Sequence, residues 1–423
     1  AILRRMERIS RQGGARRGFS EGIGGEFGYK RQDMALLNHG SFGAAPASVL
    51  AKQAQFKKQF ESQPDEWYFG GLLKKGLMSG NEKVATAINA STSQVCLVEN
   101  LSVATTIVAQ HWGEKLRKDL ETSSLSERNQ ILMLDWKYGA CKHCLAAYCT
   151  GPLHSGEIVE AKIGFPLLSQ SEVLEAVERT LKSHKIRFAF IDHITSQPTA
   201  LMPIRQIIAL CRQYGVEEIC VDGAHAFGIL DSIDCKQLDA DFYMSNCHKW
   251  GFAPHSATFL YCKHIHTPTL KHPIVSWFHG EGLQQEALWT GTRDYSAMLC
   301  VPDAIEFLQN WRSEDGNTAQ QHNHQGVVRA AKMLSEAWET QPQDLELVSS
   351  MAMVELPKSL HVQDIPGVPG DGVRGRLRRE YGIEAAIGRF ESGNYVRLSH
   401  AVYNKTEDYE RLRDAILDLV RKQ

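Results

Sequence analysis

The feature that most constrains the fold is an alternation of short β-like runs with longer amphipathic stretches, which begins near residue 80. Amphipathic helical patterns, such as those over 171–184 and 204–215, separate several of the runs. Strands that alternate with helices predict crossover connections, a mostly parallel sheet and helices on both of its faces. In such a sheet, ligands bind beyond the carboxyl ends of the strands. The β-like runs lie at 95–99, 131–135, 157–162, 187–192, 217–222, 241–245 and 257–262.

The pattern changes after about residue 296. The sequence therefore predicts an α/β fold with a large domain over 33–295 and a smaller α+β domain over 296–423. Residues 1–32 are interpreted as an N-terminal arm outside both domains. The smaller domain is predicted from a helical region at 303–341, a β-like run at 350–355, a Pro/Gly-rich loop at 364–372, a basic helix, a short β pair and a final helix at 407–422.

Composition limits the classes of partner. The chain has 423 residues and a formal net charge of −2, which gives no reason to expect nucleic-acid or membrane-surface binding. No apolar run approaches the roughly 20 residues that a membrane helix needs. The ten cysteines are scattered, which indicates reduced thiols in an intracellular enzyme rather than a disulfide framework. Cys141 and Cys144 have a CxxC spacing but no second pair, so we predict no metal site.

The N-terminal segment has a composition of its own. Residues 1–20 hold six arginines against one acidic residue, together with two serines. An arginine-rich, acid-poor, serine-containing start is typical of a mitochondrial transit peptide. A disordered basic tail explains the same composition, so a mitochondrial and a cytoplasmic location both stay open.

Two strand ends carry the residue types that pyridoxal 5'-phosphate requires. The run at 217–222 ends in Asp222, and Lys249 follows the next run, within the stretch SNCHKWGF. A lysine amine forms an imine with the aldehyde of this cofactor and can later act as a base. A carboxylate keeps the pyridine nitrogen protonated, so the ring can accept electrons from a carbanion at Cα. The acid and the lysine on neighbouring strand ends therefore predict this cofactor.

A phosphate cradle and a stacking aromatic are expected at other strand ends. After the run at 95–99, Asn100, Leu101 and Ser102 open a helical stretch, and the N–H groups at a helix start suit a dianion. The same residue types also form ordinary helix caps. After the run at 131–135, Trp136 and Tyr138 are candidates for stacking on the ring, although such aromatics are more often core residues.

Several long stretches resemble class V aminotransferase-fold enzymes. Within that group the chain is similar to the plant and algal L-cysteine desulfhydrases, and QPDEWYF at 63–69 adds to this likeness. Isopenicillin N epimerase-like enzymes and cysteine desulfurases are related to the same group. The resemblance implies fold type I of the pyridoxal-phosphate-dependent transferases, with a mostly parallel seven-stranded sheet in the large domain. The stretches that carry it are LNHGSFG (37–43), DHITSQPTALMPI (192–204), VDGAHAFG (221–228), SNCHKW (245–250), WTGTRDYS (289–296) and YVRLSHAVYNKTEDYERLRDAI (395–416).

The resemblance also implies roles for individual residues at the cofactor. Lys249 would be the Schiff-base lysine, Asp222 would pair with the pyridine nitrogen, and His225 would approach the ring hydroxyl. Thr292 would reach the phosphate of a neighbouring subunit, which implies a homodimer. The other implied contacts to the phosphate, the ring face and the ring edge come from Leu101, Ser102, Tyr138, Thr195, Ser196, Ser245 and His248.

The resemblance implies that the substrate is bound by residues from an early and a late stretch of the chain. Arg397 would clamp the α-carboxylate of an amino acid, a task that suits a bidentate guanidinium. Asn38 and His39, within NHGSFG, would line the substrate pocket, and the glycines of this stretch allow the backbone to come close to a ligand.

The reaction is a separate question, because one Cα carbanion leads to several products. The overall resemblance favours a β-eliminating C–S lyase that converts L-cysteine to hydrogen sulfide, pyruvate and ammonia. A cysteine desulfurase or selenocysteine lyase would carry a nucleophilic cysteine in the C-terminal part, but the last cysteine is Cys300. A lyase or epimerase for a larger thio-amino acid, such as hercynylcysteine sulfoxide or isopenicillin N, stays open because a few pocket groups decide substrate choice. A catalytically inactive scaffold is disfavoured, because Lys249, Asp222, His225 and Arg397 are all present.

Overall fold

The structure is a computed structural model that describes residues 25–121, 129–151, 156–361 and 372–422. Most of the N-terminal arm predicted over 1–32 lies outside these residues, as does the transit-peptide pattern at 1–20. All but the last residue of the Pro/Gly-rich loop at 364–372 lies outside them as well. Within the described part of the chain, no helix is both long enough and apolar enough to cross a membrane.

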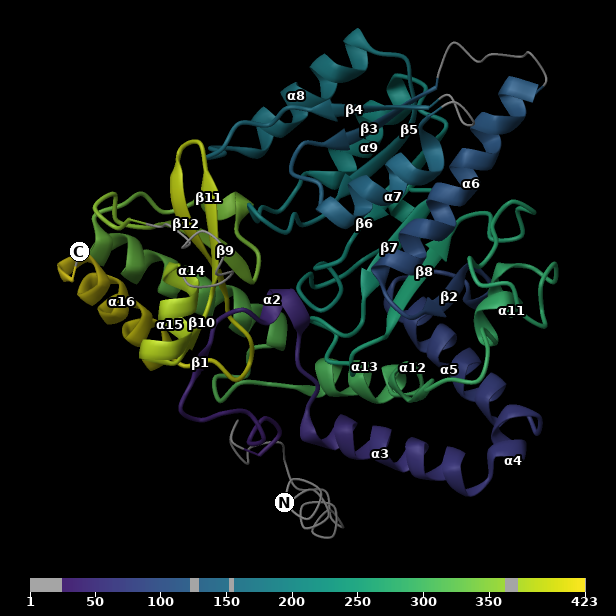
Figure 1. The fold of residues 1–423 in the computed structure, drawn as a ribbon, viewed down its shortest axis with the longest axis horizontal. Coiled ribbons are helices and arrows are strands. Elements are labelled where there is room, and N and C mark those ends of the chain that lie inside the picture. Colours follow the sequence, from purple (N-terminus) through teal and green to yellow (C-terminus); the bar gives the residue numbers. More distant parts are fainter. Residues whose placement is uncertain (1–24, 122–128, 152–155, 362–371, 423) are drawn as a thin grey trace.

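A seven-stranded sheet forms the centre of the larger unit (Figure 1). Strands β4, β3, β5, β6 and β7 pair in parallel, whereas β8 is antiparallel to both β7 and β2. Each β-like run of the sequence forms one of these strands, so the mostly parallel α/β fold is confirmed. In the order β2-β8-β7-β6-β5-β3-β4, the strands are β2 (Val95–Val98), β8 (Thr258–Cys262), β7 (Phe242–Asn246), β6 (Glu218–Asp222), β5 (Ile186–Asp192), β3 (Gln130–Leu134) and β4 (Glu157–Ala161).

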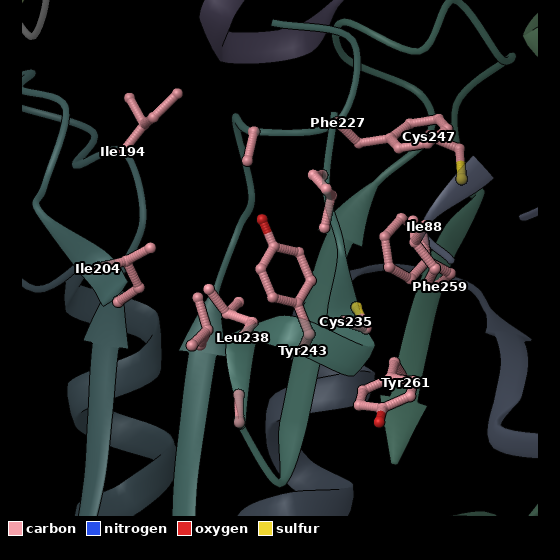
Figure 2. Close-up of a cluster of buried hydrophobic side chains, with 14 of the residues drawn as sticks. Ile88, Ile194, Ile204, Phe227, Cys235, Leu238, Tyr243, Cys247, Phe259 and Tyr261 are labelled. Atoms are coloured by element: carbon pink, nitrogen blue, oxygen red, sulfur yellow. The ribbon is translucent and has the colours of Figure 1, made fainter. Parts of the chain in front are cut away.

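The strands are apolar because helices cover both faces of the sheet. Residues of one strand alternate between two buried clusters: Leu132 and Leu134 belong to one, whereas Ile131 and Met133 belong to the other. The first cluster includes side chains from α5 (Leu72–Ala87), α8 (Gln170–Ser183) and α9 (Ile204–Gln213), and the second includes side chains from α6 (Leu101–Glu121) and α7 (Gly139–Cys149). Figure 2 shows part of the first cluster around Tyr243.

The direction of the strands gathers the candidate residues at one edge of the sheet. Because β2 is antiparallel to β8, it runs in the same direction as β7. All strands except β8 therefore point their carboxyl ends toward the same edge. Asp192 and Asp222 end β5 and β6 in register with each other. The residues after β2, β3 and β7 lie at this edge too, and it faces the smaller unit in Figure 1.

The smaller unit packs three long helices on an antiparallel sheet in the order β11-β12-β9. Strand β1 (Ala35–Leu36) also belongs to this unit by pairing, because it lies parallel to β10 (Ile383–Glu384). Helix α2 (His39–Phe42) follows β1 and lies between the two units in Figure 1. The other elements are β9 (Met351–Glu355), β11 (Ala386–Phe390), β12 (Gly393–Ser399), α14 (Ala319–Trp338), α15 (Val373–Tyr381) and α16 (Thr406–Arg421).

The domain boundary at residue 296 stays a prediction, but side chains continue to pack in the core of the larger unit beyond this residue. Helices α12 (Ser296–Leu299) and α13 (Val301–Asn310) pack on α3 (Ala47–Ser62) and α5, and their buried residues from Met298 to Ile305 belong to the core of the larger unit. The core of the smaller unit takes its helical side chains from α14 onward. Packing therefore assigns residues 296–305 to the larger unit and β1 to the smaller one.

Candidate active site

Lys249 lies in the turn that follows β7, with its amine turned into the protein. The Nζ atom is 3.5 Å from Nε2 of His225, and no other hydrogen-bond partner is found among the described residues. Burial, together with the positive charge of Arg397, lowers the pKa of Lys249 to about 8. More of this amine is therefore neutral near physiological pH than in an ordinary lysine, although the protonated form still dominates, and the neutral form is the one that attacks an aldehyde or removes a proton.

The backbone of Lys249 is held from the other side by the segment around α2. His39 donates from Nε2 to the carbonyl oxygen of Lys249 at 3.1 Å and accepts at Nδ1 from the Tyr403 hydroxyl at 2.9 Å. Burial lowers the pKa of His39 to about 3, so the ring is neutral and keeps this tautomer. Gly43 has φ +73°, and a Cβ atom there would lie 2.6 Å from Cα of Lys249. His39 thus supports the lysine as well as lying in the predicted substrate stretch.

Asp222 is the predicted partner of the cofactor ring, and its carboxylate already has a cationic neighbour. Its Oδ1 accepts from the Ala224 N–H at 2.9 Å, and its Oδ2 is 2.6 Å from Nζ of Lys137. Lys137 follows β3, has a fully buried side chain, and lies 3.3 Å from Oδ1 of Asp192. Lys137 and Asp192 were not among the predicted site residues. Their positions after buried strands could have indicated them, because Asp222 was predicted as a site residue for the same reason.

The His225 ring lies next to the amine of Lys249. Burial and the charges of Lys249 and Arg397 lower its pKa well below the ordinary value, so the imidazole is neutral. Its Nδ1 is buried and has no hydrogen-bond partner among the described residues. A buried polar atom without a partner costs free energy, which indicates that a bound molecule completes its hydrogen bonding.

Arg397 projects from β12, is buried, and has only neutral hydrogen-bond partners. It donates to the carbonyl oxygen of Ser196 at 2.8 Å, to Oδ1 of Asn38 at 2.8 Å and to the Ser41 hydroxyl at 2.7 Å. Its Nε has no partner, and within the described ranges no carboxylate pairs with it. Burial lowers its pKa to about 10, which leaves the guanidinium charged at neutral pH. A buried cation without a counterion is a site for an anion such as an α-carboxylate.

Two of the places where phosphate contacts are predicted are the beginning of α6 and Ser245 in β7. Leu101 and Ser102 form the first turn of the 21-residue helix α6, where Oδ1 of Asn100 accepts from the Val103 N–H at 3.1 Å. Ser245 is fully buried, donates to the Gly223 carbonyl oxygen and accepts from the Phe227 N–H at 3.2 Å, so its hydroxyl braces the loop after β6. Contact between Ser245 and a phosphate stays a prediction.

His248 and the remaining predicted contacts stand as follows. His248 donates from Nδ1 to the Ala257 carbonyl oxygen at 2.8 Å, and burial lowers its pKa to about 4. Tyr138 immediately precedes α7 with its side chain 56% exposed, and Thr292 is exposed in the loop after α11 (Leu283–Leu288). The Thr195 hydroxyl donates to the Pro198 carbonyl oxygen at 2.8 Å. Ring stacking by Tyr138, ring-edge contact by Ser196 and Thr195, and phosphate contact by His248 and Thr292 stay predictions.

The two cysteines of the CxxC stretch lie in α7, next to this edge of the sheet. Cys141 is buried, with Sγ 3.8 Å from Oδ2 of Asp222, and Cys144 lies 3.4 Å from the Thr106 hydroxyl. In the part of the chain that the structure describes, no group of three or more His, Cys, Asp or Glu side chains is arranged to hold a metal ion.

Fold and site together define an enzyme of the pyridoxal-phosphate-dependent class. Residues 160–412 match the Aminotransferase class-V family. The chain belongs to this family, which establishes pyridoxal phosphate as its cofactor. The residues present fit that group: Lys249 offers an amine with a lowered pKa, Asp222 a carboxylate, and His225 an unpartnered ring nitrogen. The beginning of α6 offers N–H groups for a phosphate.

Three individual proteins illustrate the likeness. The L-cysteine desulfhydrase of Arabidopsis thaliana is 38% identical over 95% of this chain and 91% of its own length. The hercynylcysteine sulfoxide lyase of Schizosaccharomyces pombe is 24% identical over 91% of this chain and 94% of its own. The structure of the cystine C–S lyase C-DES with its product cysteine persulfide superimposes with a TM-score of 0.69 at 15% identity, covering 92% of this chain and 98% of that one.

Proposed function

We propose that the protein is a β-eliminating C–S lyase that converts L-cysteine to hydrogen sulfide, pyruvate and ammonia. The observation that carries the proposal is Arg397, a buried guanidinium with only neutral hydrogen-bond partners that lies close enough to Lys249 to lower the pKa of its amine. An α-amino acid presents a carboxylate to the first group and a Cα–H bond to the second. The 38% identity to an L-cysteine desulfhydrase supports cysteine as the amino acid.

The roles of the residues follow from their positions. When bound, pyridoxal phosphate supplies an electron-accepting ring that stabilises negative charge at Cα. Lys249 would hold its aldehyde, Asp222 would face its ring nitrogen, and the unpartnered Nδ1 side of His225 would meet a polar group of the ring. Arg397 orients the substrate by its carboxylate so that the Cα–H bond is directed toward the amine of Lys249.

The proton and the leaving group can be followed through the reaction. The neutral amine of Lys249 takes the proton from Cα, since its pKa lies at about 8. The electrons of the Cα–H bond form the Cα=Cβ double bond, and the thiolate leaves from Cβ and is protonated to hydrogen sulfide. The released 2-aminoacrylate reacts with water to give pyruvate and ammonia. Cysteine and one water thus account for all three products without an oxidant.

The positions of the cysteines support sulfide release over persulfide transfer. All ten cysteines lie in the described part of the chain, and nine are buried whereas Cys144 is half-buried. Burial raises the pKa of Cys141 and of Cys300 to about 12, which keeps these thiols protonated and unreactive. A desulfurase requires a thiolate that reaches the substrate sulfur, and none of these side chains is exposed for that task.

A lyase for a larger thio-amino acid is the second candidate. The 24% identity to a hercynylcysteine sulfoxide lyase over 91% of this chain favours it. Cysteine and such a substrate share the carboxylate that Arg397 would bind, so they differ in what surrounds the sulfur.

We also propose that the enzyme is a homodimer. Phe69 and Trp277 are 72% and 79% exposed with ring centroids 6.4 Å apart, and Val275, two residues before Trp277, is 71% exposed. Large apolar side chains that gather on a surface favour a protein interface. Thr292 is exposed as well, as a residue that serves a neighbouring subunit would be. Sedimentation of the wild type and of Trp277→Glu tests this, with a dimer expected for the first and a monomer of low activity for the second. A fully active monomer would contradict the proposal.

The experiment for the reaction measures all products together. The protein loaded with pyridoxal phosphate is incubated with L-cysteine, and sulfide, pyruvate and alanine are quantified, with Lys249→Ala as the control. Sulfide and pyruvate in equal amounts without alanine are expected. Alanine in place of pyruvate would make the protein a desulfurase. No product from cysteine would leave the larger thio-amino acids as substrates.

A further inference from the structure

A cluster of three buried charges lies behind the cofactor site. Lys137, Asp192 and Asp222 come from the ends of β3, β5 and β6, which are neighbours in the sheet. Lys137 Nζ lies 2.6 Å from Asp222, 3.3 Å from Asp192 and 3.8 Å from the centroid of the Phe190 ring. All three charged side chains are at least 95% buried. One cation thus faces two carboxylates where water cannot screen them.

The cluster is short of one positive charge. With both carboxylates ionised, its net charge is −1, and a buried net charge is costly. In the apoprotein a proton reduces this cost, because burial and the nearby charge of Asp222 raise the pKa of Asp192 to about 7. The Oδ2 of Asp192 has no hydrogen-bond partner among the described residues. A second cation beside Asp222 would balance the set, and the protonated ring nitrogen of pyridoxal phosphate is such a cation.

We propose that Lys137 is a positioning residue that shares Asp222 with the ring nitrogen of pyridoxal phosphate, and that Asp192 is the carboxylate that Lys137 keeps when the cofactor is bound. The two carboxylates and the two cations then form a neutral buried set. This inference depends on the cofactor and not on the substrate proposed above. Lys137 competes with the ring nitrogen for Asp222, so it controls how firmly the ring holds its proton.

Electrostatics decides whether Lys137 and Asp192 raise or lower the pKa of the ring nitrogen. When the ring nitrogen is deprotonated in the wild type, Lys137 still neutralises Asp222, so this proton is released more readily than it would be without the lysine. When Asp192 is absent, Lys137 has Asp222 as its one carboxylate and competes more strongly. The other titratable groups that interact with the set are Lys249, Cys220, Tyr243 and Cys141, whose Sγ is 3.8 Å from Asp222. Burial raises the pKa values of Cys141, Cys220 and Tyr243, so these three groups stay neutral.

The experiment follows the ring nitrogen directly and uses no substrate. The enzyme is loaded with pyridoxal phosphate that carries ¹⁵N in the ring, and the nitrogen chemical shift is recorded against pH for the wild type and its variants. For Lys137→Met we expect the deprotonation midpoint of the ring nitrogen to rise by about one to two pH units, since one charge interaction across a few ångströms in a protein interior has this size. For Asp192→Asn we expect it to fall by about the same amount. Lys137→Arg, which keeps the charge, should stay near the wild type.

Opposite shifts in the two variants are the signature that a merely structural role would not give. If both variants titrate as the wild type does, or shift in the same direction, the proposal is overturned. Should Lys137→Met fail to take up the cofactor, the isosteric Asp192→Asn decides alone: a lower midpoint supports the proposal and an unchanged or higher one overturns it. Because no L-cysteine is added in this measurement, its outcome does not depend on whether the proposed substrate is correct.

Discussion

Replacing Arg397 by methionine should remove the substrate carboxylate site and leave the rest of the pocket in place. The two terminal nitrogens of the guanidinium donate to Ser196, Asn38 and Ser41, and Nε has no partner among the described residues. A charge-assisted hydrogen bond to a carboxylate contributes about 1.5–3 kcal/mol. One such bond from Nε therefore gives about 1.5–3 kcal/mol, or roughly 10- to 150-fold in kcat/KM.

Most of this loss should appear in KM. The carboxylate is bound in the ground state and in the transition state alike, so removing its partner weakens both and changes kcat less. The assay is pyruvate release coupled to NADH oxidation, with sulfide measured in parallel. L-Cysteine methyl ester, which lacks the negative charge, provides the matched substrate: the wild type should prefer cysteine, and Arg397→Met should show little preference.

Ser41→Ala is the control variant. It removes one hydrogen bond of 2.7 Å to the guanidinium but leaves the charge, so we expect a loss of about 1 kcal/mol, or less than about tenfold. An unchanged KM for cysteine in Arg397→Met, or a retained preference for cysteine over the ester, would refute the reasoning and place the carboxylate elsewhere.

Three further predictions follow from the same site. Lys249→Ala should lose turnover completely while its far-UV spectrum stays that of the wild type; near-normal activity would exclude this lysine as the base. Uptake of pyridoxal phosphate by the apoprotein should speed up with rising pH and level off above about pH 8, because the neutral amine reacts and the pKa of Lys249 lies at about 8. In Arg397→Met, the loss of a neighbouring positive charge should move that midpoint upward, which stopped-flow absorbance can measure. The double variant Cys144→Ser with Cys300→Ser should still release sulfide and pyruvate in equal amounts, and a switch to alanine would identify a persulfide carrier.

The sheet could be predicted from the sequence because its strands are buried on both faces. A strand such as β5, in which every residue from Ile186 to Asp192 is buried, appears as a mostly apolar run between amphipathic helices. Asp222 and Lys249 could be placed together for the same reason, since parallel strands bring their carboxyl ends to one edge. The position at which side chains stop packing in the larger unit could not be predicted, because the apolar pattern of α12 and α13 would fit a helix of either unit.

The remaining parts of the site could not be derived from local patterns. Whether the side chain of a charged residue after a strand points into the protein depends on the neighbouring strand. The sequence therefore indicated candidates at Trp136 and Tyr138 but predicted no role for Lys137. Arg397 and Asn38 lie at opposite ends of the chain, and no periodicity links them. Only the resemblance to a family implied that both serve the substrate site, and the 2.8 Å hydrogen bond between them is visible only in the structure.

The pairing of β1 with β10 has a consequence for the order in which the protein matures during synthesis. Residues Ala35 and Leu36 have their strand partners at Ile383 and Glu384, and Asn38 meets Arg397 just beyond them. The ribosome makes the parallel strands that carry Asp222 and Lys249 long before these partners emerge. The carboxylate site of the substrate therefore forms only after Arg397 has left the ribosome and met Asn38.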